Sequence, residues 1–156
     1  MKRLFIITSI FAVFFQLGAY SQAKKTGIFP EGKLTAANFT GKVWVQPLLP
    51  QDTIFNLVAG SVTFSPGARS YWHTHNAGQI LMVTNGTGYT QEKGKPIRII
   101  RQGDVITCPP NVEHWHGAST GSSMTHISLN PNADRGVVTW LRPVNDQEYQ
   151  SPKISK

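Results

Sequence analysis

Short stretches of alternating apolar and polar residues recur from Lys42 to Leu141, separated by turn residues such as Gly, Pro, Asn and Asp. Alternation with a period of two is typical of strands that are buried on one face. We expect strands over residues 43–49, 53–64, 70–75, 79–84, 88–92, 96–101, 105–108, 113–118, 124–129 and 137–141. Many short strands at this spacing indicate a sandwich or barrel. The pattern therefore predicts one all-β domain.

Two local signals refine this prediction. Asn85-Gly86 lies between two of the expected strands, and this dipeptide favours a tight hairpin turn. Asn145 is followed three residues later by Glu148, which is a capping-box spacing. We therefore expect one short C-terminal helix over residues 145–150, packed on the outside of the barrel.

The N-terminus has the pattern of a secretory signal peptide. Lys2-Arg3 precedes a twelve-residue stretch, Leu4–Phe15, that is apolar except for Thr8 and Ser9, and small residues follow. A membrane span needs about 20 apolar residues, so an uncleaved anchor is the weaker alternative. We expect residues 1–23 to be removed after Ser21 or Ala23. The protein would then be periplasmic or secreted, with no stable membrane association.

The rest of the chain divides by composition. Residues 24–41 are polar and contain glycine, and we expect a flexible lead-in there. The barrel domain is expected over residues 42–150, with a tail over 151–156. Cys108 is the single cysteine, so the chain has no intramolecular disulfide. Its place in an expected strand indicates a buried, inert thiol.

The net charge of the chain says little about its function. The formal net charge is +7, and loss of Lys2 and Arg3 with the signal peptide would remove two positive charges. The remaining basic residues are scattered and do not alternate with aromatic residues along a groove. Nucleic-acid binding is therefore not indicated, and solubility is the simpler role of the charge.

Histidines carry the candidate chemistry. His73 and His75 are one residue apart, as are His114 and His116, and His126 follows on a later strand. Alternate residues of a strand point to the same face, so each pair can direct two imidazoles to one point. The pairs predict a mononuclear metal site inside a small β-barrel.

Two motifs around these histidines resemble those of the cupins. Gly67-x5-His73-x-His75-x3-Gln79-x6-Gly86 is similar to the first cupin motif, and Gly103-x5-Pro109-x-Asn111-x2-His114 is similar to the second. The resemblance implies a single cupin barrel, that is, a double-stranded β-helix or jelly roll. It also implies that the metal ligands are His73, His75, Gln79 and His114. Three positions depart from the usual pattern, which more often has Glu at 79, Gly at 111 and Asn at 118.

A narrower resemblance covers most of the chain after the signal peptide. Five short segments are similar to segments of bacterial (R)-selective hydroxynitrile lyases: Trp72–His75, Gly78-Gln79, Gly103–Val105, Glu113–Ala118 and Met124–His126. That family implies reversible cleavage of an aromatic cyanohydrin to an aldehyde and cyanide. It implies one divalent metal ion, with Mn expected first; imidazole and oxygen ligands are also compatible with Fe, Ni, Co, Cu and Zn.

The ligand set has a chemical consequence. Three neutral imidazoles and an amide leave a divalent ion with its full charge, which a Glu at position 79 would reduce. Such an ion polarises a bound oxygen more strongly. His116 shares strand parity with His114 and should also face the interior, where it can act as a general base or acid. If Met124, His126 and Ser128 face inward, His126 is a second proton-transfer or orienting group. The alternative for His126 is a hydrogen bond to a ligand histidine.

Three functions remain open on this basis. The first is a metal-dependent lyase acting on a small hydroxylated or carbonyl compound. The second is a metal-dependent dioxygenase or other oxidative enzyme, because about two positions of an octahedral ion would be free. The third is a non-enzymatic module that binds a small ligand. For assembly, the resemblance implies a homodimer paired through edge strands.

Overall fold

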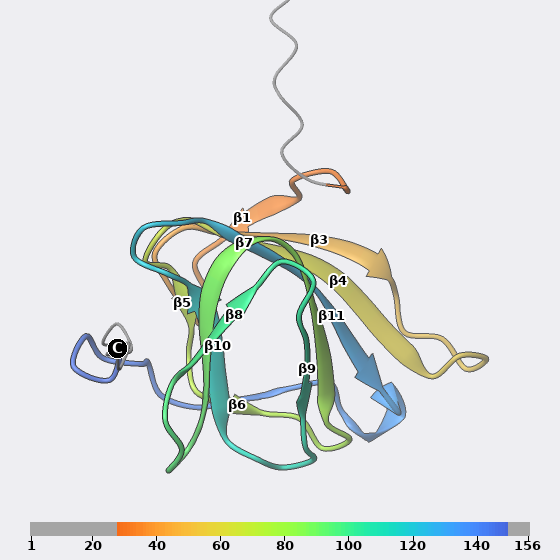
Figure 1. The fold of residues 1–156 in the computed structure, drawn as a ribbon. Helices are drawn as coiled ribbons and strands as arrows, with labels where there is room; N and C mark the ends of the chain where they lie inside the picture. The colour runs from red at the N-terminus through yellow and green to blue at the C-terminus, as the bar shows by residue number, and fades with distance from the viewer. Residues whose placement is uncertain (1–27, 150–156) are drawn as a thin grey trace, which may run out of the picture.

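The computed structural model describes residues 28–149, so the predicted signal peptide and the tail over 151–156 lie outside the described residues. The chain forms an all-β barrel (Figure 1). Its strands are β1 (Lys33–Thr35), β2 (Phe39–Thr40), β3 (Val43–Leu49), β4 (Leu57–Phe64), β5 (Arg69–Ser70), β6 (His73–Thr74), β7 (Gln79–Glu92), β8 (Arg98–Arg101), β9 (Val105–Cys108), β10 (His114–Ala118), β11 (Met124–Pro131) and β12 (Thr139–Trp140).

Two antiparallel sheets face each other across the barrel. Sheet A has the order β1-β3-β4-β11-β7-β9, and sheet B contains β8-β7-β10-β5-β2 with β6 and β12 paired beside β10. Figure 1 shows β3, β4 and β11 on one side of the barrel and β5, β8 and β10 on the other. The expected all-β barrel is confirmed. Among residues 28–149, no helix has the length and apolar character needed to cross a membrane.

The hairpin predicted at Asn85-Gly86 is wrong. β7 runs through this dipeptide as one 14-residue strand, and it pairs with β11 and β9 in sheet A and with β10 and β8 in sheet B. Gly86 has a φ of 77°, and a Cβ there would overlap the carbonyl oxygen of Ser123. The pairing with β11 shifts register at this point. The positive φ that favours a hairpin turn here produces a bulge, which bends one strand from the first sheet into the second.

The predicted C-terminal helix is a single turn among the described residues. Its capping box does form: the Glu148 amide donates to Asn145 Oδ1 at 2.9 Å, and the Asn145 amide donates to Glu148 Oε2 at 3.1 Å. The turn then gives way to Tyr149, whose hydroxyl donates to the Ala118 carbonyl. Tyr149 is thereby anchored on the barrel, and Gln150, the last residue of the expected helix, lies outside the described residues.

The apolar residues form two clusters. One fills the barrel interior and includes Val43, Phe64, Leu81, Ile100 and Met124. The other lies on the outer face of sheet B, where Trp72, Tyr89 and Trp115 pack against Val144 and Tyr149. Cys108 is buried in the first cluster, and burial raises the pKa of its thiol to about 12, which makes it unreactive at neutral pH.

Candidate metal centre

The histidines meet at one end of the barrel interior. His73 on β6 pairs directly with His114 on β10, and the centroids of their rings are 4.3 Å apart. His75 follows β6 in a loop, and its ring centroid lies 5.1 Å from that of His73. All three side chains are buried. Strand alternation holds for this pair although His75 itself lies outside the strand.

Backbone carbonyls fix the orientation of these three rings. Nδ1 of His73 donates to the Tyr71 carbonyl at 2.8 Å, Nδ1 of His114 to the Val112 carbonyl at 2.9 Å, and Nδ1 of His75 to the Val137 carbonyl at 2.5 Å. A carbonyl can only accept, so Nδ1 carries the proton and Nε2 keeps its lone pair. This arrangement is the one that orients metal-binding histidines in proteins.

Gln79 completes the group from the start of β7. Its Oε1 lies 3.3 Å from His114 Nε2, while its Nε2 donates to Ser128 Oγ at 2.9 Å and to Asn130 Oδ1 at 3.4 Å. The amide oxygen therefore points toward the histidines. With the proton of His114 on Nδ1, the two facing atoms are both hydrogen-bond acceptors. A cation between such atoms would remove the conflict, so the residues fit a divalent ion.

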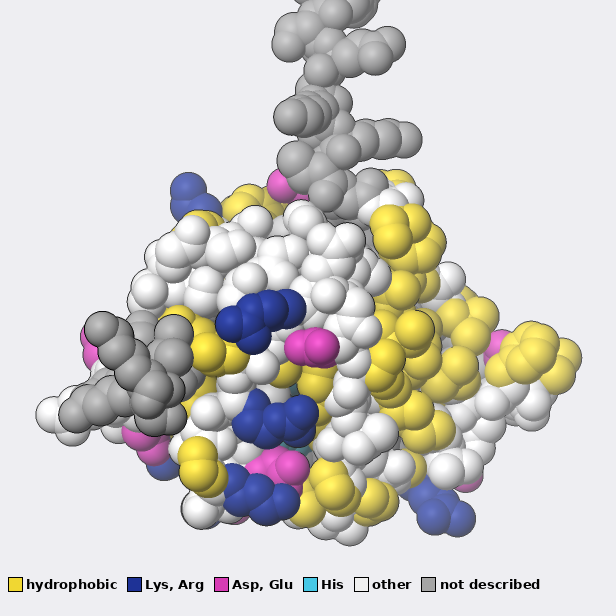
Figure 2. Space-filling model, in the orientation of Figure 1, with side chains coloured by type: hydrophobic (Ala, Val, Ile, Leu, Met, Phe, Trp, Pro, Cys, Tyr) yellow, Lys and Arg dark blue, Asp and Glu magenta, His cyan; other side chains and the backbone are white. Residues whose placement is uncertain are grey.

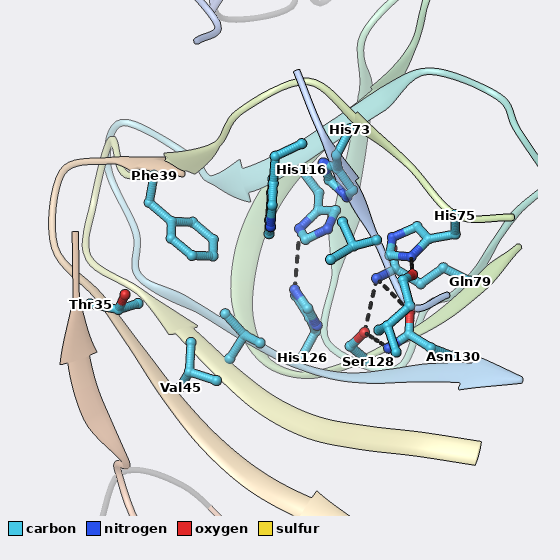
Figure 3. Close-up of a pocket in the computed structure, with 14 residues that line it drawn as sticks. Thr35, Phe39, Val45, His73, His75, Gln79, His116, His126, Ser128 and Asn130 are labelled. Carbon is cyan, nitrogen blue, oxygen red and sulfur yellow. Dashed lines mark hydrogen bonds between the residues drawn. The ribbon is translucent and has the colours of Figure 1, made fainter. Parts of the chain in front are cut away.

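A second pair of histidines lies beside this group. The Nδ1 of His116, on β10, is 3.2 Å from the Nε2 of His126, on β11 (Figure 3). Both rings are buried, and Phe64 packs against them. Nε2 of His116 is buried without a hydrogen-bond partner among the described residues, as is Nε2 of His75. Both atoms are therefore free to bind a metal ion or a substrate.

The sequence predicted His116 as a proton-transfer group, whereas the structure also places it close enough to His73 and His114 to bind the same metal ion. One possible ligand atom from each of His73, His114 and His116 lies within 4.8 Å of the others, and these three form the metal-compatible cluster of acidic, cysteine and histidine residues among the described part of the chain. His75 lies outside this cluster, although its ring centroid is 5.4 Å from that of His114. The structure thus offers His116 either as a ligand or as the proton-transfer group.

These residues open onto a cavity of about 340 Å³ (Figure 3). Its polar lining residues are His73, His75, Gln79, His116, His126, Ser128 and Asn130, and it is also lined by Thr35, Phe39, Val45, Val62, Val137, Val138 and Trp140. The Trp140 ring lies 4.9 Å from His73 and 5.6 Å from Phe39. The cavity therefore combines polar and apolar lining residues, which suits a small ligand with an organic substituent.

Comparison with known proteins assigns the family. Residues 60–129 match the model of the cupin domain. Over 129 residues the chain is 40% identical to the (R)-mandelonitrile lyase of Granulicella tundricola, which covers 83% of this chain and 98% of that protein. The chain belongs to the cupin family.

Solved structures agree with this cupin assignment. A cupin-like protein from Thermotoga maritima MSB8 matches with a TM-score of 0.78 and 44% sequence identity, over 83% of this chain and 98% of that one. A DMSP lyase from Ruegeria pomeroyi DSS-3 matches with a TM-score of 0.57 and 18% identity, over 66% of this chain and 53% of that one. The second likeness concerns the fold alone.

The second cupin motif departs from its usual pattern at Asn111, and the structure gives the reason. Asn111 has a φ of 61°, a left-handed conformation that asparagine tolerates better than most residues. Its amide donates to the His75 carbonyl at 2.9 Å. The left-handed turn at Asn111 thus connects the second motif to the first through this backbone hydrogen bond.

Some residues of the cupin cavity could not be assigned from the sequence. Thr35 and Phe39 belong to β1 and β2, within the stretch that composition indicated as a flexible lead-in. Asn130 shares strand parity with His126 and Ser128, which is the signal that could have placed it in the cavity. Its contact with Gln79 depends on long-range pairing of β11 with β7.

Replacing Ser128 with alanine should weaken metal binding. The substitution removes the closer acceptor of the Gln79 amide, so that the amide oxygen is no longer fixed toward the histidines. We expect affinity for Mn²⁺ to fall by roughly 10-fold, the lower range for groups that orient a ligand. Calorimetric titration measures this change. Ser61→Ala, at a buried serine of β4 that points away from the cavity, is the control. Equal affinities of Ser128→Ala and wild type would show that the Ser128 hydrogen bond does not position the Gln79 ligand.

The metal-free cupin should lose stability as the pH falls below neutrality. Burial lowers the pKa of His75 and of His126 from 6.5 to about 4, while histidines of the unfolded chain titrate near 6.5. The unfolded state therefore binds more protons between pH 7 and pH 4, so the stabilisation present above pH 6.5 is lost as the pH decreases. Each of the two contributes about 2 kcal/mol of this loss between pH 7 and pH 5. Urea unfolding at both pH values measures it, and an unchanged free energy would contradict the burial of neutral rings.

Proposed function

We propose that this cupin is a divalent-metal-dependent lyase that cleaves a C–C bond of a small cyanohydrin-type compound. The observation that carries the proposal is the buried Nε2 of His116. This atom has no partner among the described residues, is backed by His126, and lies beside histidines whose geometry fits a metal ion. The 40% identity to a protein named (R)-mandelonitrile lyase supports the same reaction class.

In this proposal His73, His75, Gln79 and His114 hold the ion. The fixed Nδ1 protons leave three Nε2 lone pairs available, and the oriented amide adds one oxygen. Mn is the expected metal, and Fe, Ni, Co, Cu and Zn are compatible with the same donors. When bound, a divalent ion there supplies Lewis-acid polarisation of a substrate oxygen.

Proton transfer belongs to His116. Burial lowers its pKa well below the ordinary value, with the neighbouring His126 adding to the effect, so the ring is neutral at pH 7. A neutral Nε2 can take the proton of the substrate hydroxyl. As the C–C bond breaks, its electron pair leaves with cyanide and the C–O bond becomes the aldehyde carbonyl. The proton on His116 then passes to cyanide, which restores the neutral ring and balances the reaction.

His126 positions His116. The 3.2 Å contact joins Nδ1 of His116 to Nε2 of His126, and one proton is shared between them. With that proton on His116 Nδ1, its Nε2 is a base; with it on His126 Nε2, the Nε2 of His116 can be a donor. The pair therefore allows His116 to serve both half-steps. Phe39, Val45 and Trp140 form the apolar wall that would hold the organic substituent and exclude water.

We also propose that the protein acts after export, as its N-terminal sequence predicts. The single buried cysteine is compatible with export, because it leaves no disulfide for an oxidising compartment to form within the chain. The substrate would then be a small molecule that reaches the periplasm or the exterior.

The deciding experiment measures aldehyde release from mandelonitrile by protein loaded with each candidate metal, in air and without oxygen. The proposal expects equal turnover in both atmospheres with at least one metal. Turnover that requires oxygen would favour the oxidative alternative. Tight binding of metal and cyanohydrin without any turnover would favour a binding module.

A further inference from the structure

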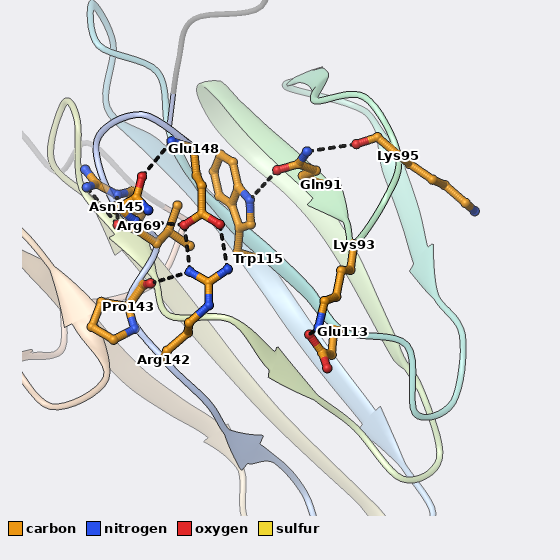
Figure 4. Close-up of polar contacts among 11 residues, drawn as sticks. Arg69, Gln91, Lys93, Lys95, Glu113, Trp115, Arg142, Pro143, Asn145 and Glu148 are labelled. Carbon is orange, nitrogen blue, oxygen red and sulfur yellow. Dashed lines mark hydrogen bonds and ion pairs between the residues drawn. The ribbon is translucent and has the colours of Figure 1, made fainter.

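Charged side chains on the outer surface are paired with one another. The Arg142 guanidinium forms an ion pair with the Glu148 carboxylate at 2.6 Å, and the Lys93 ammonium pairs with Glu113 (Figure 4). Figure 2 likewise shows Lys and Arg side chains beside Asp and Glu side chains. These surface groups find their partners within the chain, whereas one hydrogen-bond donor inside the cavity does not.

That donor is the hydroxyl group of Ser128, whose oxygen accepts two hydrogen bonds. Gln79 Nε2 donates to Ser128 Oγ at 2.9 Å, and Asn130 Nδ2 donates to the same oxygen at 3.1 Å (Figure 3). Amide nitrogens can only donate, so these bonds use both lone pairs of the serine oxygen. The hydroxyl proton remains, and it has no acceptor among residues 28–149.

The position of Ser128 makes this unshared proton available to a ligand. Ser128 is only 7% exposed, and it lines the cavity together with Gln79 and Asn130. Buried donors without a partner are unfavourable, and they are usually satisfied by the protein, by water or by a ligand. The second N–H of Asn130 Nδ2 is also without an acceptor among the described residues. This corner of the cavity therefore offers two donors to a bound molecule.

We propose that the Ser128 hydroxyl donates a hydrogen bond to the nitrile nitrogen of a bound cyanohydrin, an inference that rests on the proposed function. The carbinol carbon of such a compound carries three groups to be placed in the cavity. The hydroxyl belongs beside His116, which takes its proton, and the organic substituent belongs at the apolar lining residues, such as Phe39 and Trp140. The nitrile remains, and its nitrogen can only accept. The Ser128 proton suits that acceptor.

Gln79 connects this corner to the expected metal ligands. Its Oε1 faces His114, while its Nε2 contacts Ser128, so one amide group separates the donor from the histidines. A nitrile is linear, and its nitrogen lies two bonds beyond the carbinol carbon. A cyanohydrin can therefore present its hydroxyl to the histidines and its nitrile to Ser128 at the same time.

A hydrogen bond at the nitrile nitrogen would also assist the cleavage. When the C–C bond breaks, its electron pair leaves with cyanide, and the negative charge extends to the nitrogen. Ser128 keeps its proton and stabilises this charge through the hydrogen bond, as donors directed at developing charge do in other enzymes. The carbon end of cyanide stays free to take the proton from His116. Aldehyde and hydrogen cyanide result, and no further reactant is needed.

Two unreactive ligands of the same shape test the proposal. α-Methylbenzyl cyanide keeps the nitrile but has a methyl group in place of the hydroxyl, so it has no proton to lose to a base. In the corresponding terminal alkyne, a C–H group replaces the nitrile nitrogen and its lone pair. We expect wild type to bind the nitrile about 10-fold more tightly than the alkyne, the contribution of one hydrogen bond. Calorimetric titration measures both affinities, with Mn²⁺ bound and after treatment with a chelator.

Variants of Ser128 separate the hydroxyl from the rest of the cavity. Ser128→Ala should bind the two ligands equally, with and without metal, whereas Ser128→Thr keeps a hydroxyl and should keep the preference. Ser61→Ala, at a buried serine outside the cavity lining, is the matched control and should behave as wild type. The infrared nitrile stretch of the bound ligand gives a second readout, because a hydrogen bond moves it to higher wavenumber. Ser128→Ala should lose this shift, and circular dichroism verifies folding.

The outcomes distinguish this inference from the proposed function, because the binding measurements need no turnover. Equal affinities of wild type for the two ligands, or an unchanged preference in Ser128→Ala, would overturn the role of Ser128. A preference that disappears on removal of the metal would also overturn it, since the nitrile would then bind the ion. Mandelonitrile cleavage without a nitrile preference would remove this inference alone. A preference that depends on Ser128, without cleavage, would establish the donor and remove the lyase function.

Discussion

His114→Ala should abolish both metal binding and lyase activity. His114 is fully buried, pairs with His73 across β6 and β10, and directs Nε2 at the Gln79 amide oxygen. It therefore lies at the centre of the proposed ligand set. We expect Mn²⁺ affinity to fall by well over 100-fold, beyond the range of groups that only orient a ligand. Turnover should fall by about 10³-fold or more, as expected when the Lewis acid is lost. Metal analysis of the purified variant and aldehyde release measure the two effects.

A neighbouring residue and the metal itself provide the controls. Glu113→Gln changes the adjacent residue, whose side chain pairs with Lys93 on the surface, and should leave metal content and turnover unchanged. Wild type treated with a chelator should lose activity and regain it when Mn²⁺ is added, whereas His114→Ala should not regain it. A His114→Ala variant that keeps a full equivalent of metal would contradict the ligand assignment.

Local rules placed much of the candidate site before the fold was known. The spacing of His73 and His75, and of His114 and His116, directs each pair inward because alternate residues of extended backbone share a face. The structure places His73, His75, His116 and Gln79 in the cavity lining and His114 directly against His73, and His126 contacts His116 as its strand parity allows. The ligand roles themselves remain predictions that metal analysis must test.

Long-range pairing explains what the sequence could not supply. The direct opposition of His73 and His114 depends on the register of β6 against β10, which are about 40 residues apart. The orientation of the Gln79 amide depends on Ser128 of β11, and the sequence did not predict that β11 pairs with β7. Asn85-Gly86 has the same local signature in a hairpin and in a bulge, and the contact of Gly86 with Ser123 selects the bulge.

His116→Ala should lose turnover while metal binding is largely retained. In the proposed mechanism Nε2 of His116 takes the hydroxyl proton and returns it to cyanide, and no other described residue with a buried, unpartnered Nε2 lies outside the expected ligand set. Loss of a general acid–base group costs about 10²- to 10⁴-fold in rate. We therefore expect kcat to fall by roughly 10³-fold, with Mn²⁺ affinity within a few-fold of wild type.

Variants of His126 and His116 together decide whether His116 is a general base or a metal ligand. His126→Gln keeps a polar group near His116 Nδ1 and should lower kcat by about 10-fold only, because it alters the position of His116 and leaves the base in place. If His116 is instead a ligand, as its place in the three-histidine cluster allows, His116→Ala should lose metal as fully as His114→Ala. Metal content and kcat, measured on the same preparations, thus assign His116 to one role: lost turnover with bound metal makes it the proton-transfer group, and lost metal contradicts that role.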